Sequence, residues 1–65
     1  MKIIVNGETS EAPEGYTLGA LIESHHLTPD KVAVELNRRL VHVEKYETVL
    51  KEGDAVEIVT FVGGG

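Results

Sequence analysis

Short alternating segments separated by tight-turn dipeptides constrain the fold of this chain more than any other feature. In the opening segment, MKIIVN, apolar side chains recur at every second residue, so Met1, Ile3 and Val5 share one face of a predicted strand. The dipeptide Asn6-Gly7 follows, and both residue types tolerate the positive φ of a type I′ turn. We therefore expect a β-hairpin with a weaker second strand.

One convincing helix is predicted, from an N-cap at Thr17 to His25. Leu18, Leu21 and Ile22 share a helical stripe with His25. The segment is short and contains a glycine, which lowers its helix propensity. The helix therefore needs a sheet to pack against.

Alternation returns in the second half of the chain. The segment VAVEL, residues 32–36, places its apolar side chains on one face, and Asn37-Arg38 can form a second tight turn. The remaining elements are predicted to be a strand over residues 40–43, a short helical turn around Tyr46, a turn stabilised by Asp54, and a strand over residues 55–62. This order predicts an α+β fold, in which a mixed sheet of four to five strands packs on one short helix.

The final predicted strand has two unequal faces. Val56 and its alternate neighbours face the core, so Val59 and Phe61 point to the opposite side. Ile4 points the same way, and no second helix is predicted to cover that side. Because grouped exposed apolar side chains indicate contact with another protein, we expect Ile4, Val59 and Phe61 to dock a partner.

Composition narrows the class of protein. The 65 residues are expected to form one domain over residues 1–62, followed by a flexible glycine tail at residues 63–65. The sequence contains no cysteine, which excludes disulfides, thiolate zinc sites and iron–sulfur clusters. We see no signal peptide, and no apolar run approaches the roughly 20 residues that cross a bilayer. A cytoplasmic location with no membrane partner is therefore expected.

The charge balance favours a protein partner over nucleic acid. Eleven acidic residues against six basic ones give a formal net charge of −5 at pH 7. Nucleic-acid binding depends on cations that neutralise phosphates, so this balance argues against it. An acidic surface instead favours a partner with a basic docking face, although solubility alone also explains the charge.

Catalytic and metal-binding combinations are sparse in this sequence. His25 and His26 are adjacent, so a helix would splay them about 100° apart, and His42 alternates with two valines as an exposed strand residue would. The carboxylates are dispersed singly, and no serine or threonine has a histidine and a carboxylate at suggestive positions. We therefore predict no catalytic residue, no metal site and no bound cofactor.

The last three residues, Gly63, Gly64 and Gly65, have two unremarkable explanations, a frayed tail or a remnant of an expression vector. A third explanation is chemical. A terminal carboxylate is an anion at neutral pH and a poor electrophile, but adenylation by ATP would activate it inside a partner's water-excluding site. Glycines lack a Cβ and can thread a narrow channel, so Gly63 and Gly64 would present Gly65 there.

Essentially the whole chain resembles the ubiquitin-like β-grasp proteins, and in particular the ThiS family of sulfur carriers in thiamin thiazole biosynthesis. The resemblance rests on the opening MKIIVNGE, the segment VAVELN and the ending LKEGDAVEIVTFVGGG. The ending is specific in combination, because a Gly-Asp turn and the EIV strand precede FVGGG.

The resemblance implies a function for the tail. In that family a ThiF-like enzyme uses ATP to adenylate the C-terminal glycine, which is Gly65 here. A persulfide donor, either a cysteine desulfurase or a rhodanese-like protein, then supplies the sulfur of a thiocarboxylate. A ThiG-like thiazole synthase receives that sulfur. The resemblance thus implies a carrier that is a protein co-substrate, not an enzyme, and that is monomeric when free.

Four alternatives share part of this pattern. The small subunit of molybdopterin synthase, MoaD, has the same fold and tail chemistry, but it is usually longer and often carries prolines before its glycines. A carrier for another sulfur metabolite is a second alternative. A ubiquitin-like modifier would end on a target lysine, and a plain β-grasp interaction domain would need no free terminus.

Overall fold

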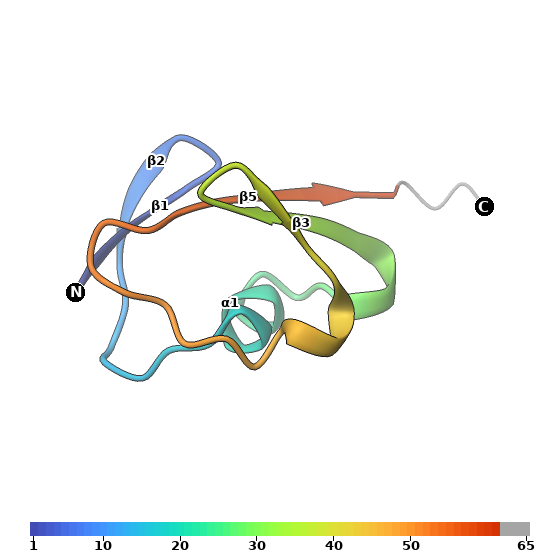
Figure 1. The fold of residues 1–65 in the computed structure, drawn as a ribbon, viewed down its shortest axis with the longest axis horizontal. Helices are drawn as coiled ribbons and strands as arrows, with labels where there is room; N and C mark the ends of the chain where they lie inside the picture. The colour runs from blue at the N-terminus through green and yellow to red at the C-terminus, as the bar shows by residue number, and fades with distance from the viewer. Residues whose placement is uncertain (62–65) are drawn as a thin grey trace.

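In a computed structural model, the described part of the chain, residues 1–61, forms a five-stranded mixed sheet with one α-helix packed against it (Figure 1). This confirms the predicted architecture, with five strands in the sheet. The elements are β1 (Lys2–Val5), β2 (Glu8–Glu11), α1 (Leu18–Ser24), a 3₁₀ turn η1 (Pro29–Lys31), β3 (Val32–Leu36), β4 (Arg39–Val41), a 3₁₀ turn η2 (Val43–Lys45) and β5 (Ala55–Thr60).

β5 lies at the centre of the sheet, in the order β2-β1-β5-β3-β4. It runs parallel to β1, with Val5 opposite Val56, and antiparallel to β3, with Ala33 opposite Val59. The two outer strands each belong to a hairpin, β1 with β2 and β3 with β4. The last strand of the chain is therefore held between the two hairpins that form earlier in the sequence.

The first hairpin turn adopts the type I′ conformation that the sequence predicts, and the second predicted tight turn adopts the same one. Asn6 and Gly7 have φ values of 50° and 85°, and Asn37 and Arg38 have φ values of 52° and 72°. Positive φ at both central residues is the signature of a type I′ turn, whose twist matches that of the flanking strands. Asparagine tolerates this conformation better than most residues, which explains its place at the first position of each turn.

The helix α1 begins where its N-cap predicts. The Thr17 Oγ1 atom accepts a hydrogen bond of 3.0 Å from the Ala20 amide, and Leu18, Leu21 and Ile22 are buried. The prediction that His25 belongs to the apolar stripe is wrong. The helix ends at Ser24, and His25 is its exposed C-cap, because His26 adopts a left-handed φ of 60° and the amides of His26 and Leu27 bond back to the last turn.

The glycine inside α1 has a packing explanation. The Gly19 amide donates a 2.8 Å hydrogen bond to the carbonyl oxygen of Tyr46, which follows η2. A Cβ at Gly19 would lie 3.4 Å from that oxygen, at the close limit of ordinary van der Waals contact. Glycine is a poor helix former, but at this position it leaves room for the segment after η2, which caps the first turn of the helix.

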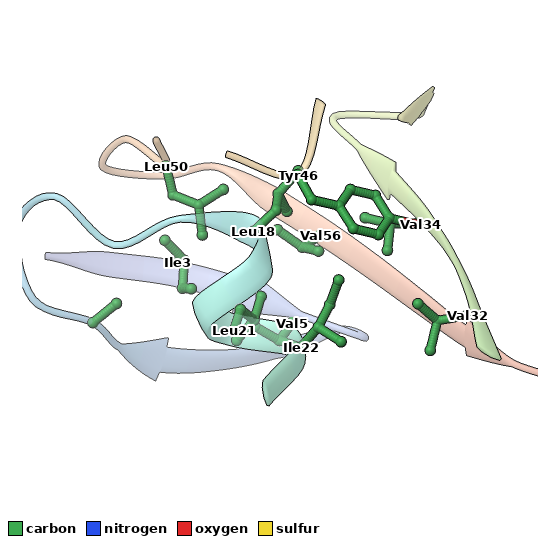
Figure 2. Packing of buried hydrophobic residues seen from close by; sticks show 11 residues of the cluster. Ile3, Val5, Leu18, Leu21, Ile22, Val32, Val34, Tyr46, Leu50 and Val56 are labelled. Carbon is green, nitrogen blue, oxygen red and sulfur yellow. The ribbon is translucent and has the colours of Figure 1, made fainter. Parts of the chain in front are cut away.

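The core lies between α1 and one face of the sheet. Its most deeply buried side chains come from three strands and the helix, and Tyr46 and Leu50 close it on the side of the long connection into β5 (Figure 2). Burial also raises the pKa of the Tyr46 hydroxyl, because the phenolate is less well solvated there. The fully buried members of the core are Ile3, Leu18, Ile22, Val34 and Val56.

Three element boundaries differ from the predictions. β4 covers residues 39–41, not 40–43, because His42 becomes the N-cap of η2 and Val43 enters that turn. The helical turn near Tyr46 is therefore a 3₁₀ turn that ends at that residue. β5 stops at Thr60, opposite Val32, the first residue of β3. Within residues 1–61, no helix combines the length and the hydropathy needed to cross a bilayer.

Candidate functional site at the end of β5

Two side-chain clamps fix β5, the strand that leads to the glycines. The first clamp is at its start, where Asp54 is buried although it is charged. One carboxylate oxygen, Oδ1, accepts a 3.0 Å hydrogen bond from Nδ2 of Asn37, and the other accepts a 2.7 Å bond from the Lys51 amide. The Asn37 Oδ1 atom in turn accepts a 2.9 Å bond from the Ala55 amide. Asp54 therefore stabilises its turn, as predicted, and also ties β5 to the β3–β4 turn.

The second clamp lies further along β5. β1 ends at Val5, so its backbone offers no partner to the Ile58 amide. The side chain of Asn6 supplies one instead: its Oδ1 accepts a 2.8 Å bond from the Ile58 amide, and its Nδ2 donates a 3.4 Å bond to the Ile58 carbonyl. The side chain of Asn6 thus continues the pairing between β1 and β5 beyond the last strand residue of β1.

The two faces of β5 differ as the sequence predicts. Val56 on the inner face is 1% exposed, whereas Val59 and Phe61 are 57% and 58% exposed. The inner face itself becomes less buried along the strand, since Ile58 is half-buried and Thr60 is exposed. β5 therefore runs out beyond the part of the sheet that α1 covers.

The three predicted docking residues share the outer face but do not form one compact cluster. Ile4 is 38% exposed and lies opposite Ala55, at the start of β5. Val59 is four residues further along β5, which is about 13 Å in an extended strand, and Phe61 lies beyond it. In Figure 1, α1 covers one side of the sheet, and no described helix covers the other.

Sequence reasoning missed three residues on this outer face. Glu35 lies directly opposite Glu57, and Leu40 lies opposite Glu35, with 59% of its surface exposed. The alternation of each strand assigns these residues to a face, but only the pairing register shows that they are neighbours. The two-residue turn at Asn37-Arg38 fixes the register of Leu40 against Glu35, but no local signal gives the register of β3 against β5.

The predicted tail residues Gly63, Gly64 and Gly65 lie outside the described residues. Among residues 1–61, no group of three side chains that could bind a metal comes together, and no pocket is enclosed. What the described part of the chain offers is a firmly held strand with an apolar and acidic outer face.

Comparison with known proteins assigns the family. The model of the ThiS family matches residues 3–65. The crystal structure of the thiamine biosynthesis protein ThiS from Geobacter metallireducens superimposes with a TM-score of 0.82 at 35% identity, covering 100% of both chains. This agreement confirms the predicted β-grasp fold. The sulfur carrier protein ThiS of Bacillus subtilis is 42% identical over 50 residues, which cover 75% of this chain and 76% of that protein.

A second group of relatives consists of larger proteins. A thiazole synthase from Magnetococcus marinus is 46% identical over 66 aligned residues, and one from Paramagnetospirillum magneticum is 39% identical. Each alignment covers 100% of this chain but 20% of the relative, so the chain spans a fifth of the length of these enzymes. The family match over residues 3–65, supported by the shared fold, shows that the chain belongs to the ThiS family.

Proposed function

We propose that this protein is a sulfur carrier of thiamine biosynthesis and that it carries sulfur as a thiocarboxylate on Gly65. The observation that carries the proposal is the family match, which spans residues 3–65 and so includes the three glycines. Two relatives support it by name, one as a sulfur carrier protein and the other as a thiamine biosynthesis protein.

The chemistry begins with the carboxylate of Gly65, taken as the free end of the chain. A carboxylate oxygen attacks the α-phosphorus of ATP, and pyrophosphate leaves. The resulting acyl adenylate is a mixed anhydride with AMP as its leaving group. The terminal sulfur of a persulfide then attacks the acyl carbon and displaces AMP. A thiol reduces the acyl disulfide that results, which leaves the thiocarboxylate on the glycine.

The partners supply the catalytic groups in this scheme. A ThiF-like adenylating enzyme binds ATP and forms the adenylate, and a cysteine desulfurase or rhodanese-like protein presents the persulfide. The carrier contributes a narrow segment without side chains, Gly63 and Gly64, that reaches into each active site. The clamps at Asn37 and Asn6 hold the root of that segment, so less conformational freedom is lost on docking.

Transfer to a thiazole synthase is supported by the larger relatives. The thiazole synthases of Magnetococcus marinus and Paramagnetospirillum magneticum contain a region similar to the whole of this chain. The presence of a related module within such enzymes favours a thiazole synthase as the partner of this module. We therefore propose a ThiG-like thiazole synthase as the acceptor of the sulfur.

Activation of the terminus tests the proposal. Purified protein is incubated with ATP and a ThiF-like enzyme, and release of pyrophosphate is measured. We expect activation of the wild type and none after one alanine is appended to Gly65, because the carboxylate is then displaced from the reacting position. Gly65→Ala is the matched control, since it keeps the chain length and adds only one methyl group. We expect it to retain part of the activity. Activation of the extended chain at the wild-type rate would contradict the proposal.

A further inference from the structure

The outer face of the sheet carries two glutamates in direct opposition. Glu35 on β3 is paired with Glu57 on β5. In the same ladder the backbone amide of Asn37 donates a 2.7 Å hydrogen bond to the Ala55 carbonyl. Residue pairs in an antiparallel ladder alternate between hydrogen-bonded and non-hydrogen-bonded. Two residues along the ladder, Glu35 and Glu57 therefore form a backbone hydrogen-bonded pair, with Cα atoms about 5.5 Å apart. Both side chains are exposed.

The positions directly across from this pair, and two residues along each strand from it, carry no basic residue. Asn37 flanks Glu35 along β3, and the nearest basic residue in the sequence is Arg38, in the turn that follows. Like charges directly opposite one another weaken a sheet, and the usual remedy is a basic residue at a neighbouring position. The positions that flank the two glutamates are instead occupied by uncharged residues, most of them apolar. They are Leu40 across β4, Ala33 along β3, and Ala55 and Val59 along β5.

Charge and apolar surface are therefore combined at the centre of an uncovered face. Val59 and Leu40 are each more than half exposed and both adjoin the glutamate pair. Leu40 lies beside Glu35 on β4, and Val59 lies two residues along β5 from Glu57. At protein interfaces, apolar side chains around a charged group exclude water and strengthen its electrostatic interaction. The free chain contains both parts of such an arrangement and lacks only the cation.

We propose that this face docks the activating enzyme through an arginine that enters between Glu35 and Glu57, while apolar side chains of the enzyme pack on Val59 and Leu40. This rests on the proposed function, which supplies the partner. Arginine fits better than lysine because its planar guanidinium presents donors along more than one edge, so that one group can serve two carboxylates. It is also more weakly hydrated than an ammonium group, which favours burial at an interface.

The test compares two double variants with the same change of charge. Glu35→Gln/Glu57→Gln removes the pair, and Glu23→Gln/Glu44→Gln removes two exposed glutamates from α1 and η2. The KM for the carrier and the kcat of ATP-dependent activation are measured at low and high salt. We expect the first variant to raise KM on the order of tenfold or more at low salt, with kcat unchanged and a weaker salt dependence. The control should change KM less than about twofold.

A thermal unfolding measurement separates docking from stability. Removing two opposed charges relieves repulsion, so the midpoint of Glu35→Gln/Glu57→Gln should be equal to or higher than that of the wild type. Loss of docking together with unchanged or higher stability supports the proposal. Equal KM values for the two double variants would overturn it. Failure of the wild type itself to be activated would instead refute the proposed function.

A double-mutant cycle identifies the partner residue. Each exposed arginine of the activating enzyme is replaced by alanine and assayed with the wild-type carrier and with the Glu35→Gln/Glu57→Gln variant. We expect one arginine whose replacement raises KM for the wild-type carrier but has little further effect with the variant. The exposed lysines are replaced in the same way. If every arginine replacement raises KM equally for both carriers, or if a lysine is the coupled residue, the proposal is wrong.

Discussion

Two valines on β5, three residues apart, have opposite environments. Val56 is 1% exposed between α1 and the sheet, whereas Val59 is 57% exposed on the other side. The residue type is the same, so the difference comes from the pleat of the strand and from the single helix, which covers one face. We therefore expect stability and partner recognition to depend on different faces of one strand. Substitutions can test the two roles separately.

The largest effect is expected on the inner face. Val56→Ala removes two buried methyl groups from a small core and should lower the free energy of unfolding by about 2–3 kcal/mol. Chemical denaturation followed by circular dichroism measures the change. The matched variant Val59→Ala should lower it by less than about 0.5 kcal/mol. A similar loss of stability in both variants would remove the distinction between the two faces.

The clamp at the start of β5 should have the next largest effect. Asp54→Ala removes the acceptor of two partly buried hydrogen bonds, from the Asn37 side-chain amide and the Lys51 backbone amide, which should cost about 2 kcal/mol. Asp54→Asn keeps one side-chain oxygen and should lose less. Urea titration of both variants gives the comparison. If Asp54→Ala unfolds at the same urea concentration as the wild type, the clamp is not needed to position β5.

On the outer face the effect should appear in binding. Phe61→Ala removes an exposed aromatic side chain at the end of β5, so we expect little change in stability and a loss of about 1–2 kcal/mol in affinity for the activating enzyme. Isothermal titration calorimetry with that enzyme measures the affinity. Val43→Ala is a control, since Val43 is also exposed but lies in η2. Equal affinities for the two variants would exclude Phe61 from the docking surface.

The smallest effect concerns Tyr46 in the core. Burial raises the pKa of its hydroxyl above the ordinary value of about 10, so the neutral form is favoured in the folded state. Its contribution to stability is complete below the unfolded pKa and is lost as the pH rises through the folded one. Between about pH 9 and 11, unfolding free energies should therefore fall more steeply for the wild type than for Tyr46→Phe. If unfolding free energy falls equally with pH for the wild type and for Tyr46→Phe, the raised pKa of Tyr46 is contradicted.

The parts of the fold set by local chemistry could be predicted from the sequence. Asn6-Gly7 forms a turn because both residue types tolerate positive φ, and alternation separates Val56 from Val59. Asn37 favours the second turn in the same way, whereas Arg38 takes a positive φ that its residue type does not predict. Relations between distant segments were not predictable in this way. The pairing of Glu35 with Glu57 depends on register, and the bonds that link Asp54 to Asn37 join residues 17 positions apart.

The helix shows the same limit. Thr17 marks its start through a local hydrogen bond, and the sequence predicts that bond. The presence of Gly19 depends on a contact made elsewhere, because the Gly19 backbone amide bonds to the Tyr46 carbonyl. The same distinction applies to the candidate site. The exposure of Val59 and Phe61 follows from alternation, whereas the opposition of Glu35 and Glu57 is visible only in the assembled sheet.

The most direct test of the account is the mass of the carrier after reaction. The protein is incubated with ATP, a ThiF-like enzyme and a persulfide donor, and the intact mass and the C-terminal peptide are measured. We predict a gain equal to the replacement of one oxygen by one sulfur, located on Gly65 and dependent on ATP. An unchanged mass under conditions in which the adenylate forms, or sulfur on any other residue, would contradict the account.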